Sequence, residues 1–202
     1  MNWQRYERLA FLFDPLERWV GNHSGFGDIR KKYIAPLEGK ILEIGAGTGA
    51  NFPYYSDKAE VIALEPSPKM LARAKQKLSL LNKKTISLEL GRAEKIKYPD
   101  NYFDIVVSSL VFCSVDDPQK AINEIKRVLK FGGRAIFIEH VASNHKFLNL
   151  ILKIINPFQK TIVGCNLQRH TGDIIRQSGL KLIKEENLKL RDVFRYFEAR
   201  KE

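Results

Sequence analysis

One carboxylate and a cluster of glycines stand together in the stretch ILEIGAGTGANF. Glu43 lies inside an apolar run of the kind that forms a strand, and it is followed by Gly45, Gly47 and Gly49. Glycines at the end of a strand let the backbone approach a ligand closely. With Ala50, the glycines also satisfy the spacing of a dinucleotide-binding loop, but that pattern alone has low specificity.

The acidic residues indicate a different ligand. The Glu43 carboxylate would repel a pyrophosphate and suits an ammonium or another cation. Glu65 ends the next apolar run, at the position where an acid accepts hydrogen bonds from a ribose diol. Ala93 and Glu94 follow the third apolar run, where an adenine ring would lie. An adenine, a ribose and a cationic amino-acid tail together describe S-adenosylmethionine.

Apolar runs and amphipathic segments alternate along the middle of the chain. Strands are expected at 40–44, 60–64, 85–90, 103–108 and 134–139, and helices at 67–81 and 117–130. Ser67 is expected to cap the first of these helices, with Pro68 at its first position, and Gly132 and Gly133 to end the second. Several strands are apolar on both faces, which predicts an α/β fold with a doubly wound, mostly parallel sheet.

The length of 202 residues predicts one domain, residues 1–202. Residues 1–37 are expected to form a helical cap, with helices at 3–20, kinked at Pro15, and at about 28–37. The cofactor-binding core would be 38–140. Residues 141–202 would supply a helix on the acceptor side and the final strands.

Four stretches carry a resemblance to the class I S-adenosylmethionine-dependent methyltransferases, which have a Rossmann-like fold. They are ILEIGAGTGANF, VIALEPSPKMLARAK, GRAEKIKYPDNYFDIVVSSLVFCSVDD and LKFGGRAIFIEH, in the family's order. The chain most resembles the branch that contains phosphatidylethanolamine N-methyltransferases, quinone-biosynthesis methyltransferases and methyltransferase-like thiol methyltransferases.

The resemblance implies roles for individual residues. The methionine and ribose would be lined by Gly45, Ala46, Gly47 and Gly49, with the cationic end near Glu43. Glu65 would hold the ribose hydroxyls, Pro66 and Met70 would pack near the adenine, and Ser109 and Leu110 would lie near the sulfonium. Arg92 stands where the family often has Asp, which leaves adenine recognition to the Ala93 backbone and Glu94.

His140 is the candidate catalytic residue. It follows the fifth expected strand, at the end that faces the acceptor in the resembling families. Its imidazole could orient the acceptor or take its proton near neutral pH; the alternative is a histidine that only bonds to backbone. Cys113 is interpreted as a buried packing residue. Cys113 and Cys165 have no zinc-type spacing, so no metal site is predicted.

Two basic, apolar segments flank the core. Residues 147–158 are intensely apolar, and Lys146, Lys153 and Lys160 flank and interrupt them at seven-residue spacing. Pro157 is expected to end the helix that they form. Such a helix, like the expected helix 3–20, fits either an anionic membrane interface or a lid over the site. The formal net charge of +11 attracts anionic surfaces. Since no base-stacking domain is evident, nucleic acid is not the favoured partner.

These features predict an S-adenosylmethionine-dependent methyltransferase that N-methylates phosphatidylethanolamine or a related lipid. One alternative is methylation of a small apolar acceptor, a thiol or a quinone precursor. Another is a non-catalytic cofactor-binding protein that acts through its basic surface. Two separate cysteines and no long apolar run favour a cytoplasmic protein, and the two basic, apolar segments favour a peripheral position at the inner membrane face. The acceptor and the oligomeric state stay open.

Overall fold

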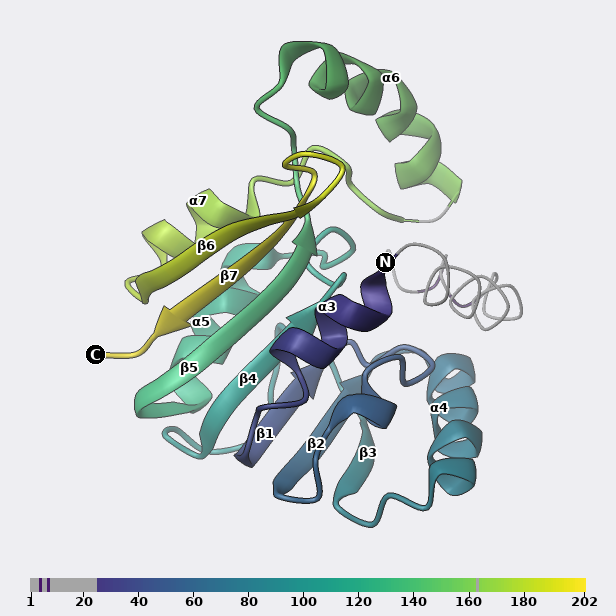
Figure 1. Cartoon of the computed structure of the whole chain (residues 1–202), viewed down its shortest axis with the longest axis vertical. Coiled ribbons are helices and arrows are strands. Elements are labelled where there is room, and N and C mark those ends of the chain that lie inside the picture. The colour runs from purple at the N-terminus through teal and green to yellow at the C-terminus, as the bar shows by residue number, and fades with distance from the viewer. Residues whose placement is uncertain (1–3, 5–6, 8–24, 163) are drawn as a thin grey trace.

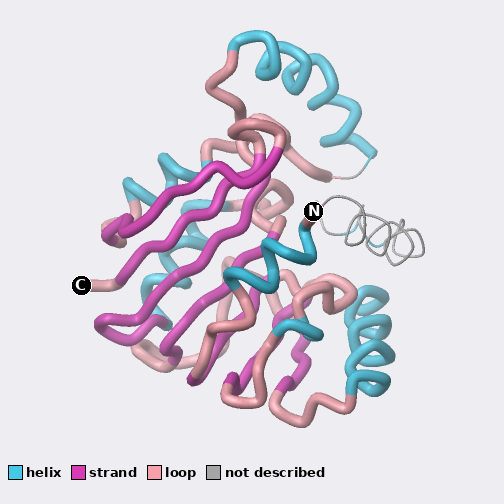
Figure 2. Tube along the Cα trace, viewed as in Figure 1, coloured by secondary structure: helices cyan, strands magenta, loops and turns pink. Residues whose placement is uncertain are grey.

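A seven-stranded sheet forms the centre of the molecule, with helices on its faces (Figures 1 and 2). This computed structural model describes residues 4, 7, 25–162 and 164–202. The strands are β1 (Gly39–Ile44), β2 (Ala59–Glu65), β3 (Ile86–Leu90), β4 (Phe103–Ser109), β5 (Leu129–His140), β6 (Lys181–Lys189) and β7 (Phe194–Arg200). The helices are α3 (Phe26–Tyr33), α4 (Pro68–Leu81), α5 (Pro118–Val128), α6 (Lys146–Ile162) and α7 (Thr171–Gln177), with a short 3-10 helix η1 (Phe52–Tyr54).

The strand order is β3-β2-β1-β4-β5-β7-β6. Strands β1 to β5 pair in parallel, and β7 is antiparallel to both β5 and β6. The order reverses beside β1, because β2 lies on one side of it and β4 on the other. The predicted doubly wound, mostly parallel sheet is therefore confirmed, and ligands of such sheets bind at the carboxyl ends of the strands near this reversal.

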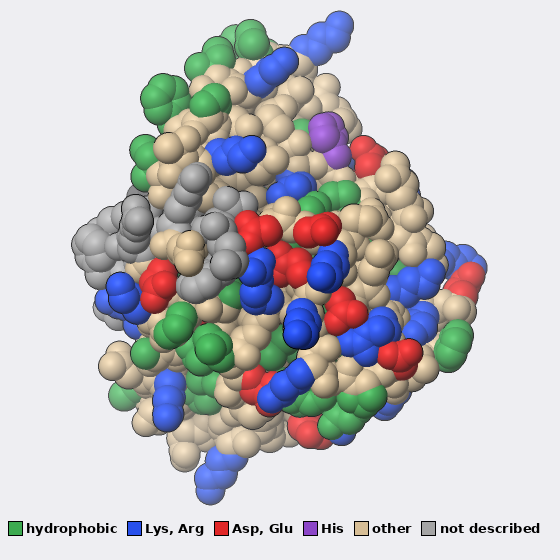
Figure 3. Space-filling model, turned by 180° about the vertical axis from the view of Figure 1, so that it is seen from behind, with side chains coloured by type: hydrophobic (Ala, Val, Ile, Leu, Met, Phe, Trp, Pro, Cys, Tyr) green, Lys and Arg blue, Asp and Glu red, His purple; other side chains and the backbone are tan. Residues whose placement is uncertain are grey.

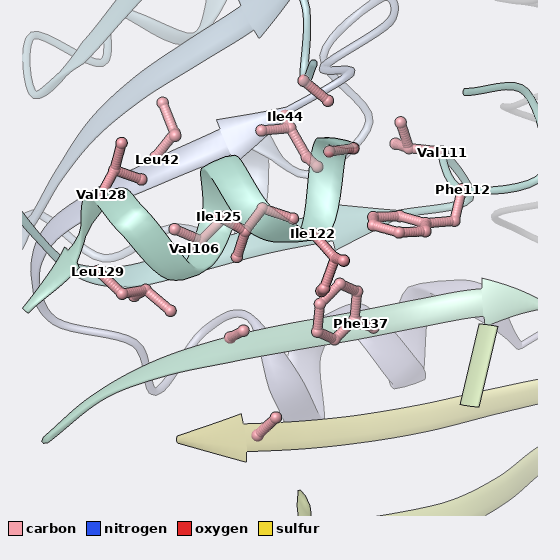
Figure 4. Packing of buried hydrophobic residues seen from close by; sticks show 14 of the residues in the cluster. Leu42, Ile44, Val106, Val111, Phe112, Ile122, Ile125, Val128, Leu129 and Phe137 are labelled. Atoms are coloured by element: carbon pink, nitrogen blue, oxygen red, sulfur yellow. The ribbon is translucent and has the colours of Figure 1, made fainter. Parts of the chain in front are cut away.

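Alternation along the strands divides the core between the two faces of the sheet. Leu42 and Ile44 of β1 belong to the face covered by α5, where they join Ile122 and Ile125. Figure 4 shows this packing around Phe137 of β5. Ile41 of β1 belongs to the opposite face, in a second cluster that includes residues of α3. Because both faces are buried, the strands have the continuous apolar character that the sequence shows.

The start of α4 has the predicted cap. The Ser67 hydroxyl accepts a hydrogen bond from the Met70 backbone N–H at 3.2 Å, and Pro68 occupies the first turn. The Asp117 carboxylate caps α5 in the same way, accepting from the Lys120 N–H at 2.9 Å. Both caps satisfy helix N–H groups that have no intrahelical partner, which fixes where each helix leaves the sheet edge.

Two expected helix ends are wrong. Helix α5 ends at Val128, and Gly132 and Gly133 lie inside β5 instead of ending the helix. A Cβ on Gly133 would be 2.8 Å from the Lys130 carbonyl oxygen, so a strand that bends here needs glycine. Helix α6 continues through Pro157 to Ile162. A proline removes one intrahelical hydrogen bond, and in an exposed helix water can bond to the freed carbonyl.

The expected second helix, 28–37, is α3 and spans Phe26–Tyr33. The expected helix 3–20 lies outside the described residues except for Gln4 and Glu7. No helix in the described part of the chain is long and apolar enough to cross a membrane.

Candidate functional site

A cavity of about 220 Å³ opens at the carboxyl ends of β1, β2 and β4. Among the predicted residues, those that line it are Gly45, Ala46, Gly47, Glu65, Pro66, Met70, Ala93, Glu94, Ser109 and Leu110. The lining residues that sequence reasoning did not select are Arg30, Thr48, Ala50, Arg92, Val111, Ser114, Val115 and Asp116. Segments up to 86 positions apart thus meet around one space, and Glu43, Gly49 and His140 are outside its lining.

The glycines of the first loop serve different purposes. All three have positive φ, a backbone conformation that residues other than glycine rarely adopt. A Cβ on Gly45 would be 2.6 Å from Val111, and a Cβ on Gly49 would be 2.4 Å from the Phe52 ring. A Cβ on Gly47 would meet no atom within 4 Å. Gly45 and Gly49 therefore permit close packing, whereas Gly47 lines the cavity and leaves space open there.

The Glu65 carboxylate is fixed at the rim of this loop. Its two oxygens accept hydrogen bonds from the Gly47 N–H at 2.8 Å and the Ser67 N–H at 2.9 Å. Burial raises the pKa of Glu65, and the two backbone donors oppose that shift. Each oxygen keeps a lone pair, so the carboxylate can accept further hydrogen bonds from two adjacent hydroxyls.

Glu43 is buried next to the cavity but is not one of its lining residues. One of its carboxylate oxygens accepts a hydrogen bond from the Asn51 amide at 2.8 Å, and the Asn51 carbonyl accepts one from Arg30 Nε at 3.0 Å. Glu43 is 2% exposed and does not line the cavity. This series of contacts connects Glu43 to a cavity-lining cation, and a direct contact of Glu43 with a ligand ammonium stays a prediction.

Arg92, at the position where the resembling family often has Asp, contacts two acids that also line the cavity. Its guanidinium lies 2.7 Å from Asp116 and 3.3 Å from Glu94. Glu94 also accepts from the Asp116 N–H at 3.1 Å. The Glu94 carboxylate thus already accepts hydrogen bonds from groups of the protein. The contribution of Glu94 to adenine recognition stays a prediction.

A buried acid that sequence reasoning missed supports the wall after β4. Glu139 is fully buried and accepts hydrogen bonds from the Ser108 hydroxyl at 2.6 Å and from the Val111 and Phe112 N–H groups. Burial raises the pKa of Glu139 to about 7. Since its folded pKa exceeds its unfolded one, this carboxyl costs stability as pH rises from about 4.5 to about 7. The same wall holds Leu110 at φ 59°.

His140 ends β5 and is 9% exposed. Its ring packs edge-on against Phe194, with 5.2 Å between centroids, and among the described residues its Nδ1 has no hydrogen-bond partner. Burial lowers the pKa of His140 to about 4. The imidazole is therefore neutral at neutral pH, which suits a proton acceptor but makes it a weak base.

We expect His140→Ala to lower turnover about 100-fold, the low end for a general base, with little change in cofactor affinity. Initial rates and calorimetric binding of S-adenosylhomocysteine check this. Because the pKa is about 4, activity between pH 6 and 8 should not titrate with His140. A loss of cofactor affinity with unchanged turnover would place His140 in the cofactor shell instead.

Cys113 is 3% exposed, in agreement with a packing role. Among the residues that the structure describes, no group of histidine, cysteine and acidic side chains could hold a metal ion.

Comparisons with known proteins identify the family of this chain. A family model described as a methyltransferase domain matches residues 42–137. The thiol S-methyltransferase TMT1B of Rattus norvegicus is 34% identical over 80% of this chain and 68% of its own. The phosphatidylethanolamine N-methyltransferase of Cereibacter sphaeroides is 29% identical over 72% of this chain and 76% of its own. A solved S-adenosylmethionine-dependent methyltransferase of Thermotoga maritima shares the fold over 100% of both chains, with TM-score 0.73 and 22% identity.

The chain belongs to the S-adenosylmethionine-dependent methyltransferases. The cavity fits that cofactor. Gly47 has no side chain and leaves space for a ligand, and its N–H holds the Glu65 carboxylate, which can accept hydrogen bonds from a ribose diol. When bound, S-adenosylmethionine supplies a methyl group on a cationic sulfur. The chain's own residues would then have to orient the two reactants and exclude water.

Proposed function

We propose that this methyltransferase N-methylates the amine of phosphatidylethanolamine or a related membrane lipid, and that α6 docks it on an anionic membrane surface. The amine must be neutral to attack, so the acceptor loses a proton during the reaction. The exposure of α6 is the observation that carries the proposal.

Helix α6 has an apolar stripe that nothing in the described part of the chain covers. None of its residues is buried. Its exposed apolar side chains are Phe147, Leu150, Ile151, Ile154, Ile155, Phe158 and Ile162. These recur at helical spacing, so they share one face. Figure 1 shows α6 beyond the end of β5, away from the layers of the sheet, and Figure 3 shows hydrophobic side chains gathered at that end.

Charge and position favour a membrane over a lid. On a regular helix, Lys146, Lys153 and Lys160 fall along one edge of the apolar stripe. Cations at that edge would lie at the headgroups while the stripe enters the interface. No residue of α6 lines the cavity, which is evidence against a lid made by this helix.

The relatives support two acceptor classes. The Cereibacter sphaeroides enzyme is named for phosphatidylethanolamine, and the Rattus norvegicus enzyme for a thiol. The second candidate function is therefore methylation of a small thiol. A lipid acceptor accounts better for an apolar helix that is exposed along its whole length.

The direct test is methyl transfer from labelled S-adenosylmethionine to phosphatidylethanolamine vesicles, with and without anionic lipid, beside a small thiol and a quinone precursor. Label in the lipid, increased by anionic lipid, is the expected result. Label only in the thiol or the quinone precursor would refute the lipid acceptor and keep the enzyme class.

Ile154→Glu tests the docking surface. Ile154 is 63% exposed. Burying one aliphatic side chain contributes about 1.5–3 kcal/mol. If the Ile154 side chain is buried in a membrane interface, Ile154→Glu should therefore weaken vesicle binding about tenfold or more. Leu80→Glu is the matched control, because Leu80 is 89% exposed on α4. Vesicle sedimentation with anionic lipid measures both variants. Equal binding by the two would remove α6 from the interface.

A further inference from the structure

Arg30 places a buried positive charge at the cavity. It lies on α3, is 6% exposed and lines the cavity, whereas its neighbours Lys31 and Lys32 are exposed. A buried cation is unfavourable unless it is paired and hydrogen-bonded. What pairs with Arg30 is therefore a question about the site.

In the described part of the chain, this guanidinium is hydrogen-bonded through Nε alone. Arg30 Nε donates to the Asn51 side-chain oxygen at 3.0 Å, and the Asn51 amide donates to Glu43 at 2.8 Å. Within residues 25–162 and 164–202, no hydrogen bond or ion pair reaches the two terminal nitrogens of Arg30. Asn51 therefore fixes the orientation of the guanidinium and leaves two nitrogens, with four N–H donors, for a ligand.

We propose that Arg30 is an oxyanion-binding site of the cavity, which takes the carboxylate at the amino-acid end of the methyl donor or the phosphate of a lipid headgroup. Both anions match the planar guanidinium through paired hydrogen bonds. Gly45 and Gly47, predicted to lie along the methionine, line the same cavity as Arg30 and favour the carboxylate. Binding of the carboxylate requires only the methyl donor. Binding of the phosphate also rests on the proposed function, in which a lipid is the acceptor.

Two ligands distinguish a carboxylate contact from general damage. S-adenosylhomocysteine carries the amino-acid end, and 5′-methylthioadenosine lacks it. By calorimetry, Arg30→Met should weaken S-adenosylhomocysteine at least tenfold and leave 5′-methylthioadenosine unchanged. Lys31→Met, on the exposed side of α3, should change neither. If Arg30→Met does not fold, Arg30→Lys should show the same selective loss with a smaller size, because it keeps the charge.

The phosphate source gives a different pattern. Arg30→Met would then leave both nucleosides unchanged, raise KM for phosphatidylethanolamine vesicles and leave KM for a small thiol unaltered. Unchanged values throughout, or an equal loss for both nucleosides, would overturn the proposal. If the lipid is not a substrate at all, the proposed acceptor fails while the calorimetric comparison still tests Arg30.

Discussion

Gly47→Val is expected to weaken the binding of S-adenosylmethionine at least 100-fold. The glycine lines the cavity, and a Cβ there would meet no protein atom within 4 Å, so the valine would occupy space that is open for a ligand. Gly47 also has φ 58°, which costs a β-branched residue about 1–2 kcal/mol and would displace the N–H that donates to Glu65. Calorimetry with S-adenosylhomocysteine measures the loss.

Gly132→Val separates occupation of the cavity from backbone strain. Gly132 has φ 76°, and a Cβ there also meets nothing within 4 Å, but the residue is exposed on β5 and does not line the cavity. Both variants should lose stability through the same unfavourable φ. Only Gly47→Val should lose cofactor affinity, and normal affinity in that variant would refute the predicted position of the cofactor.

The strands were predictable because a strand that is buried on both faces has a continuous apolar sequence. Ile41 and Leu42 point to opposite faces of β1, and both are fully buried, so the run has no polar alternation. The bend of β5 was not predictable, since Gly132 and Gly133 have the same local appearance in a strand bend as at a helix end. Contacts with a distant segment distinguish the two, such as the hydrogen bond that the Gly132 N–H donates to the Lys201 carbonyl oxygen. That contact joins residues 69 positions apart.

The site divides in the same way. The position of the glycine loop and of the residues after β2 at one cavity was predictable, because their spacing along the chain is fixed by one strand-loop-helix unit. Arg30 and Glu139 were not, because each acts through contacts with distant segments. On α3, Arg30 resembles its exposed neighbours Lys31 and Lys32. The one available signal for Glu139 was an acid inside the apolar strand RAIFIEH, where burial without partners would be too costly.

Glu65→Ala should weaken cofactor binding by about 1–3 kcal/mol, roughly 5- to 150-fold, the scale of lost hydrogen bonds to a charged group. The variant removes the proposed ribose acceptor and also leaves the N–H groups of Gly47 and Ser67 without their carboxylate. Glu65→Gln keeps the shape of the side chain and one acceptor oxygen, so its cofactor affinity should lie between those of the wild type and Glu65→Ala.

Two nucleosides test whether Glu65 acts on the ribose. S-adenosylhomocysteine and 5′-methylthioadenosine both carry the diol, so Glu65→Ala should weaken them by a similar factor, unlike the selective loss expected for Arg30→Met. Equal affinity of wild type and Glu65→Ala for both would contradict a ribose contact. Glu65 would then act only within the protein, where it joins the loop at Gly47 to the start of α4 at Ser67.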